Sequence, residues 1–234
     1  MNVLLFIQNE GGSAVARLTE AQVSETVATI NIWDLALKGG WIMIPIALLL
    51  FIAVAIMIER IFVIKKSAKE DPTFMNRIKD YIHEGKIDSA INLCRITGTP
   101  ISRMIEKGIS RLGRPMNDIL VAIENVGNIE VAKLEKGFPW VATAAAAAPM
   151  LGFLGTVTGM VRAFFAMANA GVNIEISLLS SGIYEALVTT VAGLIVGIIA
   201  LLSYNYLVAQ VTAAVNKMET YSMEFMDLLN EPTK

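Results

Sequence analysis

Three long stretches without a charged residue limit what this chain can fold into. They cover residues 41–58, residues 141–161 with a continuation past Arg162 to about 168, and residues 186–216, which follow Glu185. A helix of about 20 apolar residues crosses the ~30 Å hydrocarbon core of a bilayer. Each stretch is long enough to span. The sequence therefore predicts an all-α polytopic membrane protein with three transmembrane helices.

The overall composition excludes several classes of function. Only 17% of the 234 residues are charged, against about 25% in soluble domains. The chain has 19 Lys+Arg and 21 Asp+Glu, so it lacks the basic excess that binding nucleic acid requires. One His (His83) and one Cys (Cys94) support neither a metal cluster nor a Cys/His dyad. We expect no enzyme, no cofactor and no metal site, and we expect Cys94 to be a small core residue.

The third uncharged stretch is too long to be only a membrane span. Its 31 residues form ~46 Å of helix at 1.5 Å per residue. The apolar residues that follow are spaced three and four apart, which is typical of an amphipathic helix. They are Met218, Tyr221, Phe225, Leu228 and Leu229. The helix is therefore expected to leave the membrane and pack one apolar stripe against other helices, forming a bundle in water.

The distribution of basic residues predicts the orientation in the membrane. Segment 65–139 holds 13 of the 19 Lys and Arg residues, whereas segment 1–40 holds two and the hairpin 169–177 holds none. Loops rich in Lys and Arg stay in the cytoplasm. We therefore expect the N-terminus outside, and segment 65–139 and the C-terminus inside.

Segment 65–139 has the pattern of several helices. Three short helices are expected, the first opening at 71–72 and broken at Gly85, the second stopping at Gly98, and the third covering 101–112. From Met116 the apolar positions continue at helical spacing into the second uncharged stretch. This pattern predicts one long helix that enters the bilayer near residues 138–140.

Small residues predict where the spans pack. The second stretch contains Gly155-x-x-x-Gly159 and the third contains Gly193-x-x-x-Gly197. In lipid, such small residues let helix backbones approach closely. The two helices can pack on each other or on neighbouring subunits, and the presence of two such faces favours an assembled ring or bundle.

Polar residues inside the spans are the candidate functional groups. A lone carboxylate at Glu185 costs roughly 2.5–3.5 kcal/mol in the membrane unless it is paired, protonated or in a cavity. Arg162 is expected to extend to the outer headgroups, with pairing to Glu185 or to a partner's acid as the alternative. For Thr143 and Thr158 we favour hydrogen bonds to carbonyls of their own helix.

Several motifs, in this order and spacing, resemble one family. They are WDLALKGGWIMIP at 33–45, APMLGFLGTVTGM at 148–160, GIYEALVTT at 182–190 and GLIVG at 193–197. Together they are similar to the MotA/TolQ/ExbB proton-channel family, and most of all to ExbB. Three spans with a large cytoplasmic segment also resemble ExbB and TolQ, since MotA-type subunits have four spans.

The resemblance implies a homo-pentamer in the bacterial inner membrane whose second and third spans surround a pore. Transmembrane helices of an ExbD-like single-span partner would occupy that pore. Proton flow would then drive mechanical work on a TonB-like protein for energised outer-membrane transport. The alternatives are a TolQ-like role in envelope maintenance and a membrane scaffold that conducts no ions.

By the same resemblance, the family's pore glutamate falls on Glu185 and its two threonines on Thr156 and Thr190, with Thr189 as a further hydroxyl. Thr hydroxyls can relay protons but do not store them at neutral pH. The carboxylate that carries the proton deep in the pore is therefore expected to come from the partner.

The resemblance makes the outer side of the membrane the periplasm. The expected organisation is then a periplasmic segment with an interfacial helix at 1–40, transmembrane helices at 41–64, 140–168 and 178–206, a cytoplasmic helical segment at 65–139, a periplasmic hairpin at 169–177 and a cytoplasmic C-terminal helix at 207–234.

Overall fold

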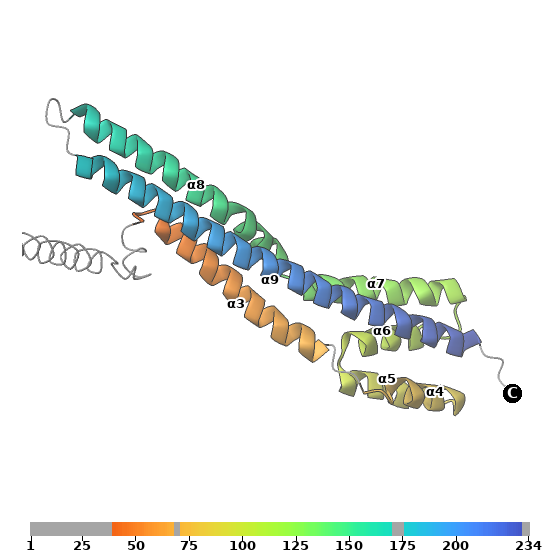
Figure 1. Ribbon diagram of the computed structural model, residues 1–234. Coiled ribbons are helices and arrows are strands. Elements are labelled where there is room, and N and C mark those ends of the chain that lie inside the picture. Colours follow the sequence, from red (N-terminus) through yellow and green to blue (C-terminus); the bar gives the residue numbers. More distant parts are fainter. Residues whose placement is uncertain (1–38, 68–70, 170–175, 231–234) are drawn as a thin grey trace, which may run out of the picture.

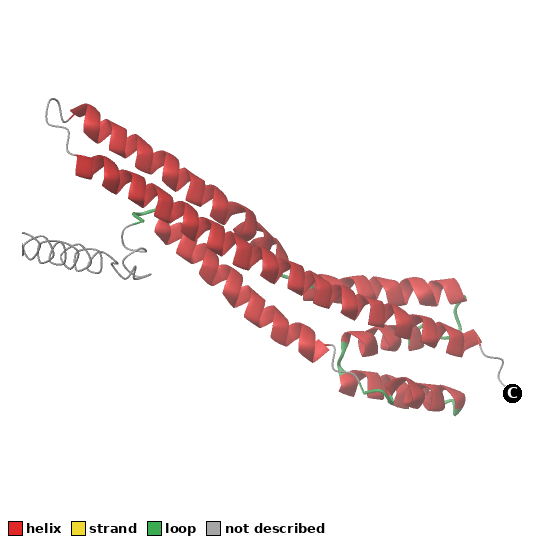
Figure 2. Ribbon diagram, viewed as in Figure 1, coloured by secondary structure: helices red, strands yellow, loops and turns green. Residues whose placement is uncertain are grey.

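The computed structural model describes residues 39–67, 71–169 and 176–230, and in these residues every regular element is a helix (Figures 1 and 2). The all-α prediction is therefore confirmed. Of the expected periplasmic segment 1–40 with its interfacial helix, residues 1–38 lie outside the described residues. In chain order the helices are α3 (Met43–Ser67), α4 (Phe74–His83), α5 (Ile87–Thr97), α6 (Pro100–Ile109), α7 (Met116–Leu134), α8 (Phe138–Asn169) and α9 (Ile176–Asn230).

Three of these helices, α3, α8 and α9, are long and apolar enough to cross a membrane. α9 has 55 residues, or ~82 Å at 1.5 Å per residue, far more than one bilayer core requires. It runs beside α8 at one end of the elongated molecule and beside α6 and α7 at the other (Figure 1). One continuous helix therefore connects the apolar spans to the helical bundle.

α3 packs on both α8 and α9 through two small clusters of buried apolar side chains. In one, Ile42 and Ile46 meet Val196 of α9, and in the other Ala53 meets Val141 and Ala200. The outward faces carry large exposed apolar side chains, including Phe51, Phe153 and Leu202. Such a surface suits hydrocarbon rather than water.

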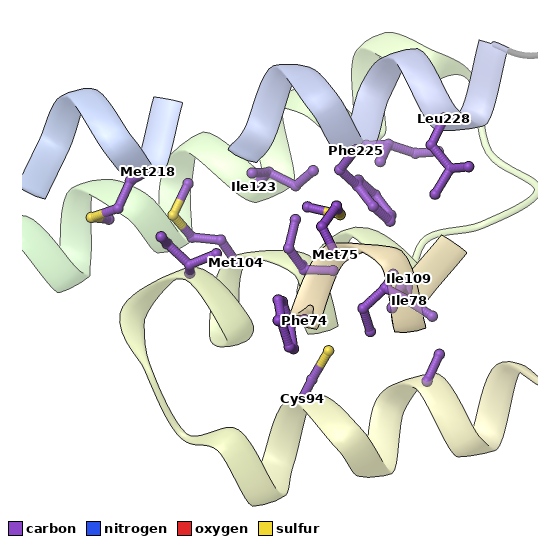
Figure 3. Close-up of a cluster of buried hydrophobic side chains, with 14 residues drawn as sticks. Phe74, Met75, Ile78, Cys94, Met104, Ile109, Ile123, Met218, Phe225 and Leu228 are labelled. Carbon is purple, nitrogen blue, oxygen red and sulfur yellow. The ribbon is translucent and has the colours of Figure 1, made fainter. Parts of the chain in front are cut away.

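The helices outside the spans form a bundle with its own apolar core (Figure 3). Phe225 and Leu228 of α9 lie on Ile123 of α7 and on residues of α4 and α6, with Tyr221 and Leu229 packed beside them. The predicted apolar stripe is therefore confirmed.

Cys94 is also fully buried in this core, and burial raises the pKa of its thiol to about 12. As expected, it acts as a small core residue.

The prediction of one long helix from Met116 into the membrane is wrong, because the chain breaks between α7 and α8. Gly137 adopts a left-handed conformation with φ of 92°, which ends a helix and favours glycine. Pro139 follows in the first turn of α8, where its missing N–H costs nothing. A Cβ at Gly137 would lie 3.2 Å from Ile56 Cγ2, so α3 also packs closely against this break.

Arg60 links α3 to the C-terminal end of α7, next to the break between α7 and α8. Its side chain is only 9% exposed, and Nη1 donates to the Lys133 carbonyl at 3.1 Å. This carbonyl lies in the last turn of α7, where carbonyls lack a partner in their own helix and a cation is favourable. Nη2 contacts the Glu59 carboxylate.

Glu130 of α7 forms a buried ionic cluster one turn earlier. Its carboxylate accepts hydrogen bonds from Arg103 Nη2 at 2.5 Å and from Lys133 Nζ at 2.7 Å. Burial alone would raise the pKa of Glu130, but the bonds from Arg103 and Lys133 outweigh it and hold the pKa below its ordinary value. The cluster therefore joins α6 to α7.

We predict that replacing Glu130 with Gln removes a stabilising charge that depends on pH. Because the folded-state pKa is lowered, the contribution is present above the unfolded value of about 4.3 and is lost as pH falls through the folded value. At pH 7 the free energy of unfolding in detergent should drop by about 1–3 kcal/mol. The difference from wild type should narrow toward pH 3. Glu124→Gln, an exposed substitution on the same helix, is the control and should show neither effect.

Candidate functional site

The site is built on the contact between α8 and α9, where small residues allow the two backbones to touch. A Cβ added at Gly193 would lie 2.5 Å from the Ala148 carbonyl oxygen and 2.9 Å from Gly152 Cα. One added at Gly159 would lie 2.9 Å from Ala186 Cβ. No larger side chain fits without moving backbone. The structure thus pairs the two small-residue faces within one chain.

The other glycines of the two motifs lie in the same contact. Gly155 faces Thr189, and Gly197 lies against Pro149, whose Cγ would be 2.6 Å from an added Cβ. Pro149 has no N–H, so the Ala145 carbonyl loses its usual partner in α8. Gly197 lets α9 approach this carbonyl, with an added Cβ only 3.2 Å from its oxygen.

The threonine hydroxyls of the two helices fall into two groups. Most of them donate to a carbonyl of their own helix, as is typical of transmembrane threonines. These are Thr143 to Pro139 at 2.7 Å, Thr156 to Phe153 at 2.6 Å, Thr158 to Leu154 at 2.9 Å and Thr189 to Ala186 at 2.8 Å. Thr190 differs, because its hydroxyl crosses the contact and donates to the Gly152 carbonyl of α8 at 2.9 Å.

These positions bear on the expectation that Thr156, Thr189 and Thr190 line a pore. Thr189 is only 1% exposed and faces Gly155, so in the single chain it lies inside the helix contact. Thr156 and Thr190 are half-buried and keep part of their surface at the edge of this contact. Of the three, these two are the ones that a neighbouring molecule can reach.

Glu185 and Arg162 meet at the other end of the contact. Arg162 Nη1 donates to Glu185 Oε1 at 3.2 Å, and the two side chains are 55% and 28% exposed. The sequence left two kinds of position open for Arg162, extension to the headgroups or pairing with an acid. In the structure Arg162 pairs with Glu185. The described parts of the two spans thus hold one acid and one base, joined across α8 and α9.

The sequence did not reveal that the segment before α3 also reaches Glu185. Gly40 has φ of 66°, and a Cβ there would overlap the Glu185 carboxylate. A Cβ at Gly39 would lie 3.5 Å from Thr189 Cγ2. The only signal was the Gly39–Gly40 pair just before the first span. Among the described residues, no group of three or more His, Cys, Asp or Glu could hold a metal ion.

Comparison with known proteins gives this arrangement its class. The sequence profile of the MotA/TolQ/ExbB proton channel family matches residues 97–220, more than half of the chain. The chain therefore belongs to the MotA/TolQ/ExbB proton channel family. With three helices able to span a bilayer, it is a multi-pass membrane protein. Its family is one of proton-channel subunits, not of enzymes.

Relatives with ExbB and TolQ names match most of the chain. An ExbB homolog of Methanothermobacter thermautotrophicus is 28% identical over 78% of this chain and 64% of its own length. The aligned part thus spans less than two thirds of that relative. An ExbB-like protein of Synechocystis is 30% identical over 77% of this chain and 72% of its own length. TolQ of Haemophilus influenzae is 29% identical over 87% of this chain and 95% of its own length.

We predict that Gly193→Val separates α8 from α9. The added atoms would meet backbone on α8, which cannot move aside as a side chain can, so the free energy of unfolding should fall by about 1–3 kcal/mol. Ala146→Val, an exposed substitution on α8, is the matched control and should leave the melting temperature in detergent unchanged. Equal melting temperatures for the two variants would contradict the close contact.

Proposed function

We propose that the chain is an ExbB-like subunit of a proton-driven motor in the bacterial inner membrane. With an ExbD-like partner, it converts proton motive force into mechanical work on a TonB-like protein, for energised transport across the outer membrane. The observation that carries the proposal is Glu185, the one carboxylate in residues 178–216, in a member of a proton-channel family.

The polar groups of the two spans support a proton path that the chain cannot complete alone. Glu185 can gain and lose a proton within the membrane, which is the property a proton path requires. Thr156 and Thr190 lie half-buried at the edge of the α8–α9 contact, and their hydroxyls can orient water or pass a proton on. Because the deeper part of the two spans has no other carboxylate, the proton carrier there comes from the partner.

The surface of the spans supports an assembly around that partner. Large apolar side chains such as Val157, Leu187 and Leu194 remain exposed on α8 and α9 in the single chain, which leaves them available to pack on neighbouring chains. We infer a homo-pentamer in which α8 and α9 of five chains surround the partner helices. This inference draws on the family likeness for the number of chains.

The charge distribution supports the orientation. Thirteen of the 19 basic residues lie in 65–139, and Lys65 and Lys66 form the last turn of α3. By the positive-inside rule this end of α3 is cytoplasmic. The helical bundle and the C-terminus then lie in the cytoplasm, and the Arg162–Glu185 pair lies near the periplasmic face.

A TolQ-like role in envelope maintenance is the second candidate. The alignment with TolQ of Haemophilus influenzae favours it, because that alignment covers 95% of the relative and 87% of this chain. Deleting the gene separates the two roles. Loss of energised uptake of an outer-membrane substrate supports the ExbB-like role, and leakage of periplasmic proteins supports the TolQ-like one.

We predict that Glu185→Ala and Thr156→Ala each reduce proton flux to background in proteoliposomes of the intact complex. The first removes the group that binds the proton, and the second removes a hydroxyl of the path. Thr143→Ala is the matched control, because Thr143 is exposed and its hydroxyl bonds its own helix. Its flux should equal that of wild type.

Size-exclusion chromatography must show that each variant still assembles with its partner. Wild-type flux in both the Glu185 and the Thr156 variants would contradict the proposal and favour a scaffold that conducts no ions.

A further inference from the structure

The side chain of Glu185 is held from two other parts of the chain at once. Arg162, 23 residues earlier on α8, donates to its Oε1 at 3.2 Å. Gly40, from the turn before α3, lies so close that any side chain there would overlap the same oxygen. Neither contact belongs to α9 itself, so the position of this carboxylate depends on how three segments are packed.

The Gly40 contact is specific to its surroundings. Gly40 can be compared with Gly85, because φ is 66° at Gly40 and 69° at Gly85. Both conformations favour glycine. A Cβ at Gly85 would meet nothing within 4 Å, whereas one at Gly40 would overlap Glu185. Gly40 therefore leaves room for the carboxylate in addition to making its turn.

Among the described residues, the charged group that contacts Glu185 is Arg162. In residues 137–168 Arg162 is the only Lys, Arg, Asp or Glu, and in residues 178–216 the only one is Glu185. From α3 and the turn before it, the described group against Glu185 is Gly40, which has no charge. On α9 the neighbouring titratable group is the Tyr184 phenol. An arginine remains charged at any physiological pH, so it is a permanent counter-ion.

We propose that Arg162 is a positioning residue for Glu185, holding its carboxylate in a fixed resting place that Gly40 leaves open. The proposal rests on the proposed function, because it concerns how the Glu185 carboxylate binds protons. In this resting place Oε1 is engaged by the guanidinium. A proton that binds to the carboxylate neutralises it and removes the charge–charge attraction to Arg162, leaving only a weaker hydrogen bond to a neutral carboxyl group. Protonation therefore weakens the link between Glu185 and α8, and deprotonation restores it.

Infrared spectroscopy of the purified chain tests the position of Glu185 directly. The band that Glu185→Gln removes from the spectrum identifies this carboxylate. Arg162→Gln should shift that band, because it removes the donor to Oε1. Gly40→Ala should shift it as well, because the new methyl group displaces the same oxygen. Gly85→Ala introduces the same substitution at a similar positive φ and should leave the band in place.

Proton flux in proteoliposomes of the intact complex tests whether that position matters. Arg162→Gln and Gly40→Ala should each lower the flux at least about tenfold, corresponding to 1.4 kcal/mol. Arg162→Lys keeps the charge and should restore most of the flux. Gly85→Ala should match wild type. Size-exclusion chromatography and melting temperature show whether each variant remains assembled, and Gly40→Ala, compared with Gly85→Ala, serves as the test if Arg162→Gln does not assemble.

Three results would overturn the inference while leaving the proposed function intact. They are a band that stays in place in Arg162→Gln, a flux that stays at the wild-type level in the same variant, and a flux loss in Arg162→Lys as large as in Arg162→Gln. A band that stays in place would mean that Arg162 interacts with the lipid headgroups instead of with Glu185. Wild-type flux in Glu185→Gln would contradict the proposed function itself.

Discussion

α8 and α9 approach each other so closely that the backbone of each lies against glycines of the other. In hydrocarbon, apolar side chains gain nothing by leaving lipid for protein, so helices associate through contact area and hydrogen bonds at short range. Glycine and alanine have little or no side chain, so they allow the two backbones to come this close. The rest of the membrane part depends on this contact, because α3 packs on the surface that the pair presents.

The same contact decides the state of the polar groups. In an apolar environment each of them needs a partner within the protein. Thr190 finds one in the Gly152 carbonyl, because no side chain separates the helices there. Glu185 finds Arg162. In the proposed proton path these groups are already paired, so moving a proton along it would exchange one partner for another. This is the sense in which packing and proton binding are coupled.

Much of the fold could be predicted because it follows from local patterns. The absence of charge located the spans, and the spacing of Met218, Phe225 and Leu228 identified the face of α9 that packs in the bundle. The break at Gly137 was missed, because the apolar spacing continues across it as though the helix did. A single glycine in the left-handed region outweighs that pattern. The contact of Gly40 with Glu185 joins residues 145 positions apart. Local sequence patterns cannot predict a contact between residues so distant in the chain.

The sequence by itself determined which segments are apolar enough for lipid, where the charge lies, and that Glu185 and Arg162 are the charged groups of the last two spans. Only the tertiary structure decided what these groups bind. A hydroxyl can donate to its own helix or to the next one at similar energy, and an arginine can reach headgroups or a carboxylate. The choice depends on the distance between helices, which is set by side chains from distant parts of the chain meeting at one contact.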